Sequence, residues 1–282
     1  HTNTMAGFPR VAIIYLSFRS EPYLADVIQA LKKITYPKER LEFLIVDNPH
    51  PEFGLSQKAI EAEVLPLSGK EIPPVTYLPQ EKNLGFSGGN NVGIQWAIEH
   101  GFAYVYFHNN DGFMAPHCLE PLVETLERDK SIGVAQSLII LYPEIDRINT
   151  TGNCFQYLGF GYCGNYYKRV EDVPLPKVKE ICYASGAALL MRTDLLKRCG
   201  LLDEDFFMYH EDCEYSMRLR ALGYKTVLVS DSIFYHKYQF SRSMDKFYFM
   251  ERNRWAILLM FFKLPTLMLL APMLLILEIG LW

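Results

Sequence analysis

The sequence predicts an α/β protein in which helices cover a largely parallel β-sheet. Apolar runs of strand length alternate with helical patterns along roughly its first hundred residues, an order typical of parallel sheets. Half of the 282 residues are hydrophobic and 14% are aromatic, which argues against a disordered chain. No internal repeat or flexible linker separates the predicted elements, so we expect one domain before the C-terminal tail.

Four buried strands and two helices are predicted in the first part of the chain. The first helix places Leu24, Val27, Ile28 and Leu31 on one face, the spacing of an amphipathic helix. The second helix opens within a glycine- and asparagine-rich segment. The strands are predicted at residues 11–16, 41–46, 75–78 and 104–107, and the helices at 21–33 and 86–100.

Shorter elements are predicted in the second part of the chain. Residues 146–179 are rich in Gly, Tyr, Asn and Pro, so we expect loops and short strands there. Two helices are expected to end at Gly200 and Gly223, because glycine adopts the left-handed conformation that commonly closes a helix. These helices are predicted at 195–199 and 211–222, and the strands at 184–191 and 226–229.

Charge and cysteine content restrict the class of protein. The net charge of −4 gives no support for nucleic-acid binding, and no Cys-x-x-Cys pair indicates a zinc or redox site. We expect the six scattered cysteines to be reduced thiols of a cytosolic protein. Residues 1–4 resemble a tag remnant before Met5, and no signal peptide is expected after it.

The C-terminal segment, residues 255–282, differs in composition from the domain predicted at residues 8–254. Lys263 and Glu278 are its only charged residues, and two prolines interrupt it. One interpretation is a buried or dimer-forming helix. The other is a helix pair that lies in or enters a bilayer, and we favour it because the segment is too apolar for a solvated surface.

A polar turn follows the predicted strand that ends at Phe107, and it ends on Asp111. Ligands of α/β proteins bind at the carboxyl ends of strands. A carboxylate there can hold a hard divalent cation, which in turn can hold a diphosphate, although an ordinary turn aspartate fits equally well. His236 also follows a predicted strand and could either ligate the same cation or be structural. Mn²⁺ accepts such mixed ligands better than Mg²⁺.

Two further segments could contact a nucleotide. Asp47 ends the second predicted strand and could accept hydrogen bonds from a base, or else cap a turn or helix. Residues 83–93 contain four glycines and three asparagines, so their backbone N–H groups could approach an anion at a helix N-terminus. The alternative is a plain tight turn. The segment matches neither the P-loop nor the Gly-x-Gly-x-x-Gly pattern.

A second acidic cluster, Glu211 and Asp212, begins a predicted helix. Acids at a helix N-terminus can simply stabilise the helix dipole. The preceding aromatic run, residues 206–210, instead suggests an apolar wall that would raise the pKa of a neighbouring carboxylate. Such a carboxylate could act as a general base.

Taken together, these segments resemble the family 2 glycosyltransferases, which have the GT-A fold, and in particular their rhamnosyltransferase-like branch. The resemblance covers residues 11–254, and it implies a Rossmann-like mixed sheet flanked by helices. Each segment is a weak match alone, but their order and spacing are specific. The matching segments are residues 11–17, 45–48, 83–93, 109–111, 186–192, 202–212, 223–224 and 251–253.

The resemblance also implies a role for each candidate residue. Asp111 would be the last residue of a DxD-like motif that binds Mn²⁺ or Mg²⁺, with His236 as a second ligand. Asn109 stands where that motif has its first acid, which leaves the metal affinity open. Asp212 would be the general base, with Glu211 beside it. The predicted donor-binding residues are Tyr15, Ser17, Asp47, Gly85, Phe86, Asn90, Asn110 and Asp111.

The function implied is inverting transfer from a UDP- or dTDP-sugar to a glycan or lipid-linked acceptor, in surface polysaccharide assembly. We expect the protein at the inner face of the cell membrane, held there by its tail, which could also pair subunits. A nucleotidyltransferase is one alternative, but it would usually show a basic, glycine-rich loop near the first strand, and residues 17–20 contain no glycine. A non-catalytic sugar-binding or scaffold protein is the other.

Overall fold

A mixed ten-stranded sheet forms the centre of the protein, in a computed structural model that describes residues 7–238 and 244–281. The strands are β1 (Val11–Ser17), β2 (Leu41–Asp47), β3 (Val75–Pro79), β4 (Tyr104–Asn109), β5 (Gly112–Met114), β6 (Ile132–Leu141), β7 (Ile148–Thr150), β8 (Asn153–Phe155), β9 (Gly161–Cys163), β10 (Val178–Glu180), β11 (Ala188–Arg192) and β12 (Lys225–His236). The α-helices are α1 (Leu24–Lys33), α2 (Gln57–Ala59), α3 (Gly85–Glu99), α4 (Leu119–Arg128), α5 (Thr193–Cys199), α6 (Glu211–Ala221), α7 (Met244–Phe261) and α8 (Leu264–Leu281).

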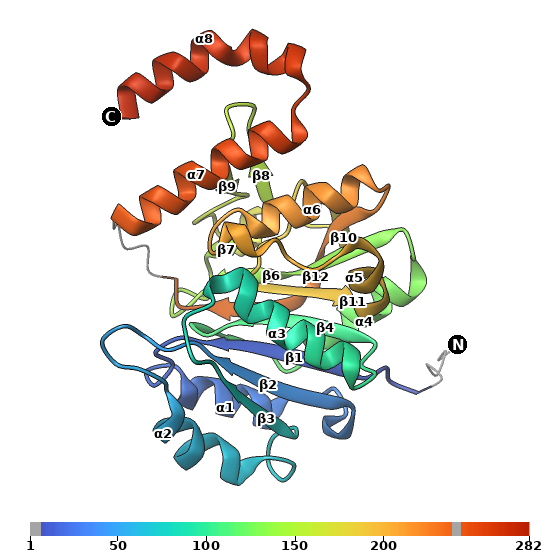
Figure 1. Cartoon of the computed structure of the whole chain (residues 1–282). Coiled ribbons are helices and arrows are strands. Elements are labelled where there is room, and N and C mark those ends of the chain that lie inside the picture. The colour runs from blue at the N-terminus through green and yellow to red at the C-terminus, as the bar shows by residue number, and fades with distance from the viewer. Residues whose placement is uncertain (1–6, 239–243, 282) are drawn as a thin grey trace.

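The sheet order is β10-β12-β6-β11-β4-β1-β2-β3, with β5 beside β12 and β7 beside β6 (Figure 1). The pairs β1–β2, β1–β4, β2–β3 and β6–β12 are parallel. Strand β11 is antiparallel to both of its neighbours, β4 and β6. The predicted mixed α/β sheet with flanking helices is therefore confirmed. Strands β8 and β9 form a separate antiparallel pair.

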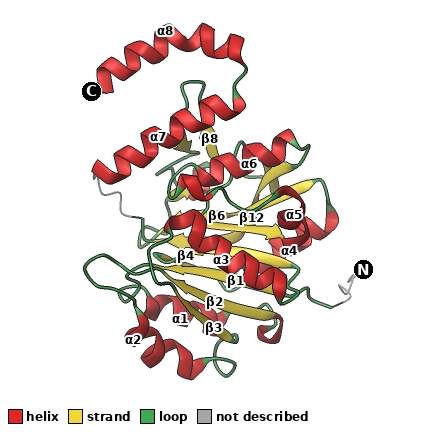
Figure 2. Ribbon diagram, viewed as in Figure 1, coloured by secondary structure: helices red, strands yellow, loops and turns green. Residues whose placement is uncertain are grey.

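Helices cover both faces of the sheet (Figure 2). Alternate residues of β1 enter different cores, because successive side chains of a strand point to opposite faces. Ile13 packs in a cluster with apolar residues of α1 and α4, whereas Ile14 packs with residues of α3, α5 and α6. Covering of both faces explains why the parallel strands are continuous apolar runs.

Three sequence predictions differ from the structure. The strand expected at 184–191 begins only at Ala188, because the preceding backbone N–H groups of Ser185 and Gly186 bond to side chains of Gln136 and Asp212. The strand expected at 226–229 continues to His236 through a register shift. The sequence analysis assigned no element to residues 112–145, where β5, α4 and β6 lie.

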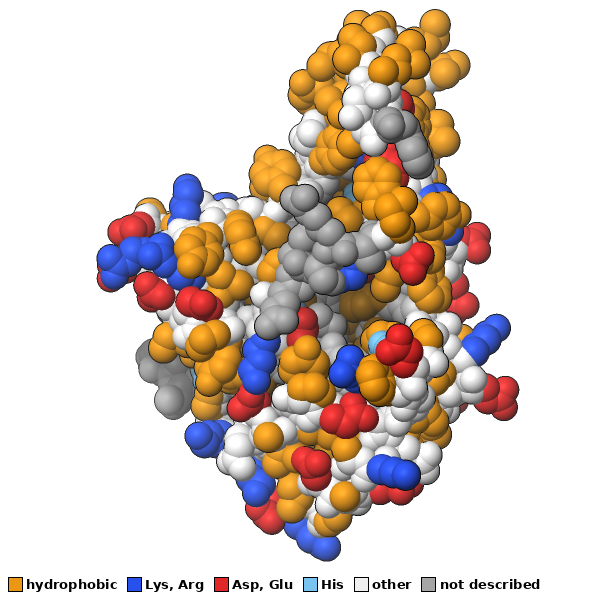
Figure 3. Space-filling model, turned by 90° about the vertical axis from the view of Figure 1, so that its left-hand side faces the viewer, with side chains coloured by type: hydrophobic (Ala, Val, Ile, Leu, Met, Phe, Trp, Pro, Cys, Tyr) orange, Lys and Arg blue, Asp and Glu red, His pale blue; other side chains and the backbone are white. Residues whose placement is uncertain are grey.

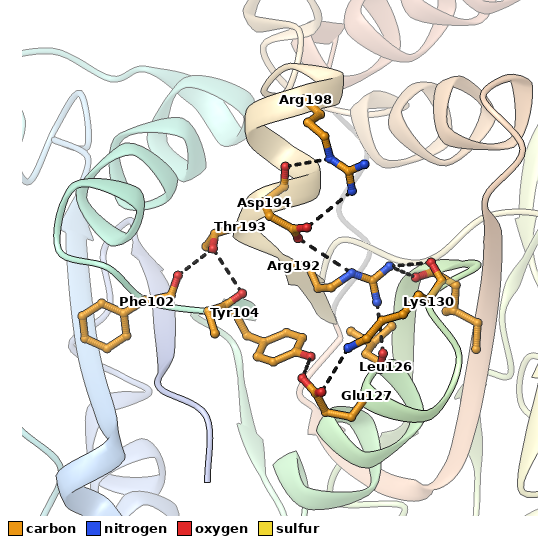
Figure 4. A network of polar contacts seen from close by, with 11 residues as sticks. Phe102, Tyr104, Leu126, Glu127, Lys130, Arg192, Thr193, Asp194 and Arg198 are labelled. Atoms are coloured by element: carbon orange, nitrogen blue, oxygen red, sulfur yellow. Dashed lines mark hydrogen bonds and ion pairs between the residues drawn. The ribbon is translucent and has the colours of Figure 1, made fainter. Parts of the chain in front are cut away.

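A polar network surrounds the carboxyl end of β11 (Figure 4). Arg192, the last residue of β11, is almost fully buried. Its guanidinium donates to the carbonyl oxygens of Leu126, Lys130 and Ile132, at 3.1, 3.0 and 2.5 Å, and lies 3.8 Å from a carboxylate oxygen of Asp194. Because these contacts join α4, β6 and α5, they hold β11 in place.

The C-terminal helices α7 and α8 project from the domain as a hairpin whose outer surface is largely hydrophobic (Figure 1, Figure 3). Asn253, Arg254, Ile257 and Leu258 of α7 are buried, so the boundary expected at 254/255 lies within a helix that packs on the domain. In α8 only Leu274 is buried. This helix is the one in the described residues that is long and apolar enough to cross a membrane.

Candidate active site

The carboxyl ends of β1, β2 and β4 meet at one edge of the sheet. Ser17 lies opposite Asp47, and Leu16 opposite Asn109. The turn after β4 is held to β1 by two contacts. The hydroxyl of Tyr15 donates to the carbonyl oxygen of Asn110 (3.1 Å). The side-chain amide of Asn110 donates to the carbonyl oxygen of Phe18 (2.9 Å).

Asp111 and His236 lie side by side at this edge. Strand β5 pairs antiparallel with β12 and places Gly112 opposite His236. Nε2 of His236 is 2.8 Å from Oδ1 of Asp111, and its Nδ1 is 2.8 Å from Oδ1 of Asn149. The amide of Asn109 donates to the same Asp111 oxygen at 2.7 Å. The side chain in place of the first DxD acid therefore supports Asp111.

Asp111 and His236 could hold a divalent cation together with a bound diphosphate, but they do not form a complete protein site for it. In the described ranges, 7–238 and 244–281, no group of three or more His, Cys, Asp or Glu side chains converges as a metal site. Asp111 and His236 offer one oxygen and one nitrogen. Cations of this kind are often held by one or two protein ligands plus substrate phosphates and water, and the mixed pair suits Mn²⁺ better than Mg²⁺.

Asp212 lies in the first turn of α6 and is half-buried. Its Oδ2 accepts a hydrogen bond from the backbone N–H of Gly186 at 2.9 Å. Loss of water around the carboxyl raises its pKa to about 6, and the backbone N–H groups of Gly186 and Cys213 partly oppose that rise. A carboxylate with this pKa is largely ionised at neutral pH and is more basic than an ordinary aspartate.

Glu211 differs from its neighbour. Its side chain is buried, and its Oε2 has no hydrogen-bond partner among the described residues. Burial raises its pKa well above the ordinary value, and the charge of Asp212 raises it further. Asp212 is thus the more exposed of the two acids, whereas Glu211, also predicted to be catalytic, is buried.

The two predicted acidic groups are linked by a short path across β4 and β11. Asp212 accepts from Gly186, and the carbonyl oxygen of the next residue, Ala187, accepts from the backbone N–H of Asn109 at 3.0 Å. The Asn109 side chain in turn bonds Asp111. Asp111 and Asp212 are 101 positions apart in the sequence, and this path connects them at the end of the sheet where β4 ends and β11 begins.

The first backbone N–H groups of the glycine-rich segment bond within the protein, and donor binding at Gly85 stays a prediction. The N–H groups of Phe86 and Ser87 donate to the carbonyl oxygen of Phe207, at 2.7 and 3.2 Å. Those of Leu84 and Gly85 donate to the side chains of Asn48 and Asn83.

These glycines instead allow close packing. A Cβ at Gly85 would overlap the carbonyl oxygen and the ring of Phe207. A Cβ at Gly89 or Gly93 would collide with Leu16 or Ile14 of β1. The glycines therefore let α3 approach the sheet and the 206–210 loop closely, and this packing alone requires glycine at these positions.

Several other predicted donor-binding residues are enclosed. Asp47 is 0% exposed and accepts hydrogen bonds from the hydroxyls of Ser17 (2.7 Å) and Tyr77 (2.8 Å). Tyr15 and Ser17 are also fully buried. The buried amide of Asn90 donates to the carbonyl oxygen of Phe86. Because these polar atoms bond to one another, donor binding by these residues stays a prediction.

Among the predicted donor-binding residues, those at least partly exposed are Phe86, Asn110 and Asp111. Beside Asn110 lies an aromatic group that the sequence analysis missed: Phe18, His50 and Phe53. The His50 ring lies between the other two, with centroid distances of 4.9 Å to Phe18 and 4.9 Å to Phe53. Phe53 is exposed. An aromatic residue directly after the first strand was the available signal, because exposed rings there can stack on a base.

The fold and the acidic residues at the ends of its strands define a GT-A-type protein. The chain belongs to the glycosyltransferase-like family 2, whose model matches residues 9–257. This membership favours a glycosyltransferase over the nucleotidyltransferase and scaffold alternatives.

Two curated relatives illustrate the family. The low-salt glycan biosynthesis hexosyltransferase Agl10 of Haloferax volcanii is 22% identical over 215 residues, which are 74% of this chain and 61% of that protein. The N-acetylglucosaminyl-diphospho-decaprenol L-rhamnosyltransferase of Mycobacterium tuberculosis is 24% identical over 247 residues, 80% of this chain and 75% of that protein. The chain thus spans about three fifths of the first relative and three quarters of the second.

Solved structures share the fold at lower identity. GalNAc-T7 with UDP, GalNAc and Mn²⁺ has a TM-score of 0.66 and 13% identity, over 90% of this chain and 48% of that one. S. aureus TarS 1–349 in complex with UDP-GlcNAc has a TM-score of 0.57 and 16% identity, over 84% of this chain and 60% of that one.

Proposed function

We propose that this protein is an inverting glycosyltransferase that moves a sugar from a UDP- or dTDP-sugar to a hydroxyl of a glycan or lipid-linked acceptor. The observation that supports it most directly is that Asp212, with its raised pKa, is linked by a short hydrogen-bond path to Asp111 and His236 where β4 ends and β11 begins. Family membership supports sugar transfer.

Asp212 acts as the general base in this proposal. Its carboxylate removes the proton of an acceptor hydroxyl, whose oxygen then forms the new bond at the anomeric carbon as the bond to the diphosphate breaks. A single displacement of this kind inverts the anomeric centre. The N–H of Gly186 holds the carboxylate at 2.9 Å and so fixes its orientation.

The donor lies at the ends of β1 and β4. Asn110 orders the turn, and the exposed rings of Phe18 and Phe53 offer a surface on which a base can stack. Asp111 and His236 would hold Mn²⁺ or Mg²⁺ against the diphosphate, as the Mn²⁺ and UDP complex of GalNAc-T7 suggests for this fold. Such a cation offsets the charge that grows on the leaving group.

The acceptor is proposed to be lipid-linked, at the cytoplasmic face of a membrane. The mycobacterial relative is named for N-acetylglucosaminyl-diphospho-decaprenol, a lipid-linked sugar, and α8 exposes an apolar surface suited to a bilayer. The hairpin α7–α8 would hold the active site close to such an acceptor, in the assembly of a surface polysaccharide.

The test is release of UDP or dTDP from a panel of nucleotide sugars, with and without the Asp212→Asn substitution. Asparagine retains the shape and accepts from Gly186 but does not take a proton. We expect turnover to fall about 10²–10⁴-fold, with little change in donor binding. Unchanged turnover would remove Asp212 from this role. The product's anomeric configuration, read by NMR, decides whether transfer is inverting.

A further inference from the structure

The loop before α6, residues 206–210, has an unusual backbone. Phe207, Tyr209 and His210 all have positive φ angles, of 59°, 67° and 67°. Non-glycine residues rarely adopt this conformation, and it persists only where surrounding contacts enforce it. The loop leads directly into Glu211 and Asp212, so its shape sets where the first turn of α6 begins.

Asn253 of α7 supplies the contacts that enforce this backbone. It is 1% exposed. Its amide nitrogen is 2.9 Å from the carbonyl oxygen of Phe206, 2.8 Å from that of Met208 and 2.7 Å from that of Tyr209. Three carbonyl groups of one short loop thus converge on a single side-chain donor from a helix more than 40 positions away.

The remaining carbonyl groups of the loop point elsewhere. That of Phe207 accepts from the backbone of Phe86 and Ser87 at the start of α3, and that of His210 accepts from Glu214 in α6. The loop is therefore a junction. It contacts the start of α3 beside the proposed donor region and leads into the helix that carries Asp212. Asn253 of α7 bonds to three of its carbonyl groups.

We infer that Asn253 is a positioning residue for the transfer reaction, which holds the left-handed 206–210 loop and thereby fixes the position of Asp212. This role rests on the proposed function. The residue touches neither substrate nor base; it acts through the loop. Without its amide, the carbonyl groups of Met208 and Tyr209 lose this donor, whereas that of Phe206 still accepts from Arg252 at 3.1 Å, and the strained backbone relaxes toward ordinary angles.

A relaxed loop would change the surroundings of Asp212 in a measurable way. Its pKa is raised by loss of water, so added water would lower it toward the ordinary value. Titratable groups that interact with Asp212 include Glu211 and Cys213 of α6, Cys163 of β9, and Tyr183. Asn253 is itself uncharged, so replacing it with alanine removes no charge from the surroundings of Asp212.

The experiment compares Asn253→Ala with Leu258→Ala. Both remove a buried α7 side chain, but Leu258 lies beside Gly159, outside the apolar cluster that contains Phe206 and Cys213, and offers no hydrogen-bond donor. The full chain in detergent is labelled with ¹³C at aspartate carboxyl groups, and the signal lost in Asp212→Asn identifies Asp212. We expect Asn253→Ala to lower the Asp212 titration midpoint by about one pH unit, and Leu258→Ala to leave it unchanged.

Turnover of UDP-GlcNAc and dTDP-rhamnose gives the second readout. Asn253→Ala should lower kcat about 10²-fold, as small misplacements of a reacting group do, with the donor KM nearly constant. Leu258→Ala should keep kcat while lowering Tm. If Asn253→Ala does not fold, Asn253→Ser, which retains one donor, is judged by the same criteria.

The outcomes separate the two proposals. An unchanged Asp212 titration in a folded Asn253 variant, or an equal shift in Leu258→Ala, would overturn the positioning role. Absence of turnover by the wild type on every nucleotide sugar tried would instead overturn the proposed function, and the titration would still decide whether Asn253 fixes Asp212.

Discussion

Nε2 of His236 lies 2.8 Å from Oδ1 of Asp111, although 125 positions separate the two residues. The antiparallel pairing of β5 with β12 makes this contact, because it sets Gly112 opposite His236. Asn149 holds the other ring nitrogen, and Asn109 holds the carboxylate. Both candidate ligands are thus oriented before any cation arrives, as metal ligands commonly are.

Removal of either member of this pair should weaken metal-dependent donor binding. We expect Asp111→Ala and His236→Ala to reduce the affinity for UDP in the presence of Mn²⁺ by about 10–100-fold, with a smaller effect in its absence. Calorimetric titrations of UDP with and without Mn²⁺ measure this. Glu144→Ala, at an exposed acid, is the control. Equal Mn²⁺-dependent affinity in all three variants would exclude the pair as a metal site.

The rate should depend on pH through Asp212. A general base must be ionised, and burial raises the pKa of Asp212 to about 6. We therefore expect turnover to fall as the pH drops below about 6 and to level off above it. A pH–rate profile checks this, and a profile that is flat down to pH 4.5 would contradict it.

Stability should respond to pH in the opposite direction. The folded state binds the Asp212 proton more tightly than the unfolded chain, because its pKa lies above the ordinary 3.8. Between these values the contribution of this group to the free energy of unfolding declines as the pH rises. Burial of Glu211 acts in the same sense. Asp212→Asn should flatten the dependence of Tm on pH between 4 and 7.

Substitution of Gly85 should destabilise the protein rather than weaken donor binding alone. Its φ is +69°, and a Cβ there would meet the Phe207 carbonyl and ring. We expect Gly85→Ala to lower the free energy of unfolding by roughly 2–5 kcal/mol from strain and overlap together. Gly101 has a similar φ of +73° but open space around it, so Gly101→Ala introduces backbone strain without overlap. It should lower the free energy of unfolding, measured in urea, clearly less than Gly85→Ala does.

Membrane binding should depend on α8 but not on α7. Ile257 and Leu258 are buried against the domain, so a truncation after Arg254 would remove packing as well as the tail. A truncation after Phe262 should remain folded and lose flotation with phosphatidylglycerol-containing vesicles. Ile276→Asp, at a side chain that is 72% exposed, should weaken flotation without lowering Tm. Full flotation of the truncated protein would contradict anchoring by α8.

The sequence predicted the central strands and the edge at which the site lies, because continuous apolar runs and polar stops are local patterns. It failed where a strand is interrupted: Ser230-Asp231-Ser232 hid the second half of β12, which carries His236. The pairing of Asp111 with His236 and the general-base role proposed for Asp212 followed from the resemblance rather than from periodicity.

Burial and close packing could not be predicted in the same way. The enclosure of Asp47 by Ser17 and Tyr77 depends on three different strands. The role of Gly85 depends on Phe207, and the three contacts of Asn253 depend on a loop far away in the sequence. Each is a tertiary contact, and a single sequence carries no local signal for it.

Glu278, the one charged residue of α8, pairs with Arg254, which also pairs with Glu251 and is 0% exposed. Dissolved ions weaken contacts between solvated charges, but they hardly reach an enclosed guanidinium. High-salt washes that strip peripheral proteins should therefore leave the hairpin's attachment to the domain intact. Purification conditions should accordingly be set by the choice of detergent, because ionic strength has little influence on the contacts between Arg254 and Glu278.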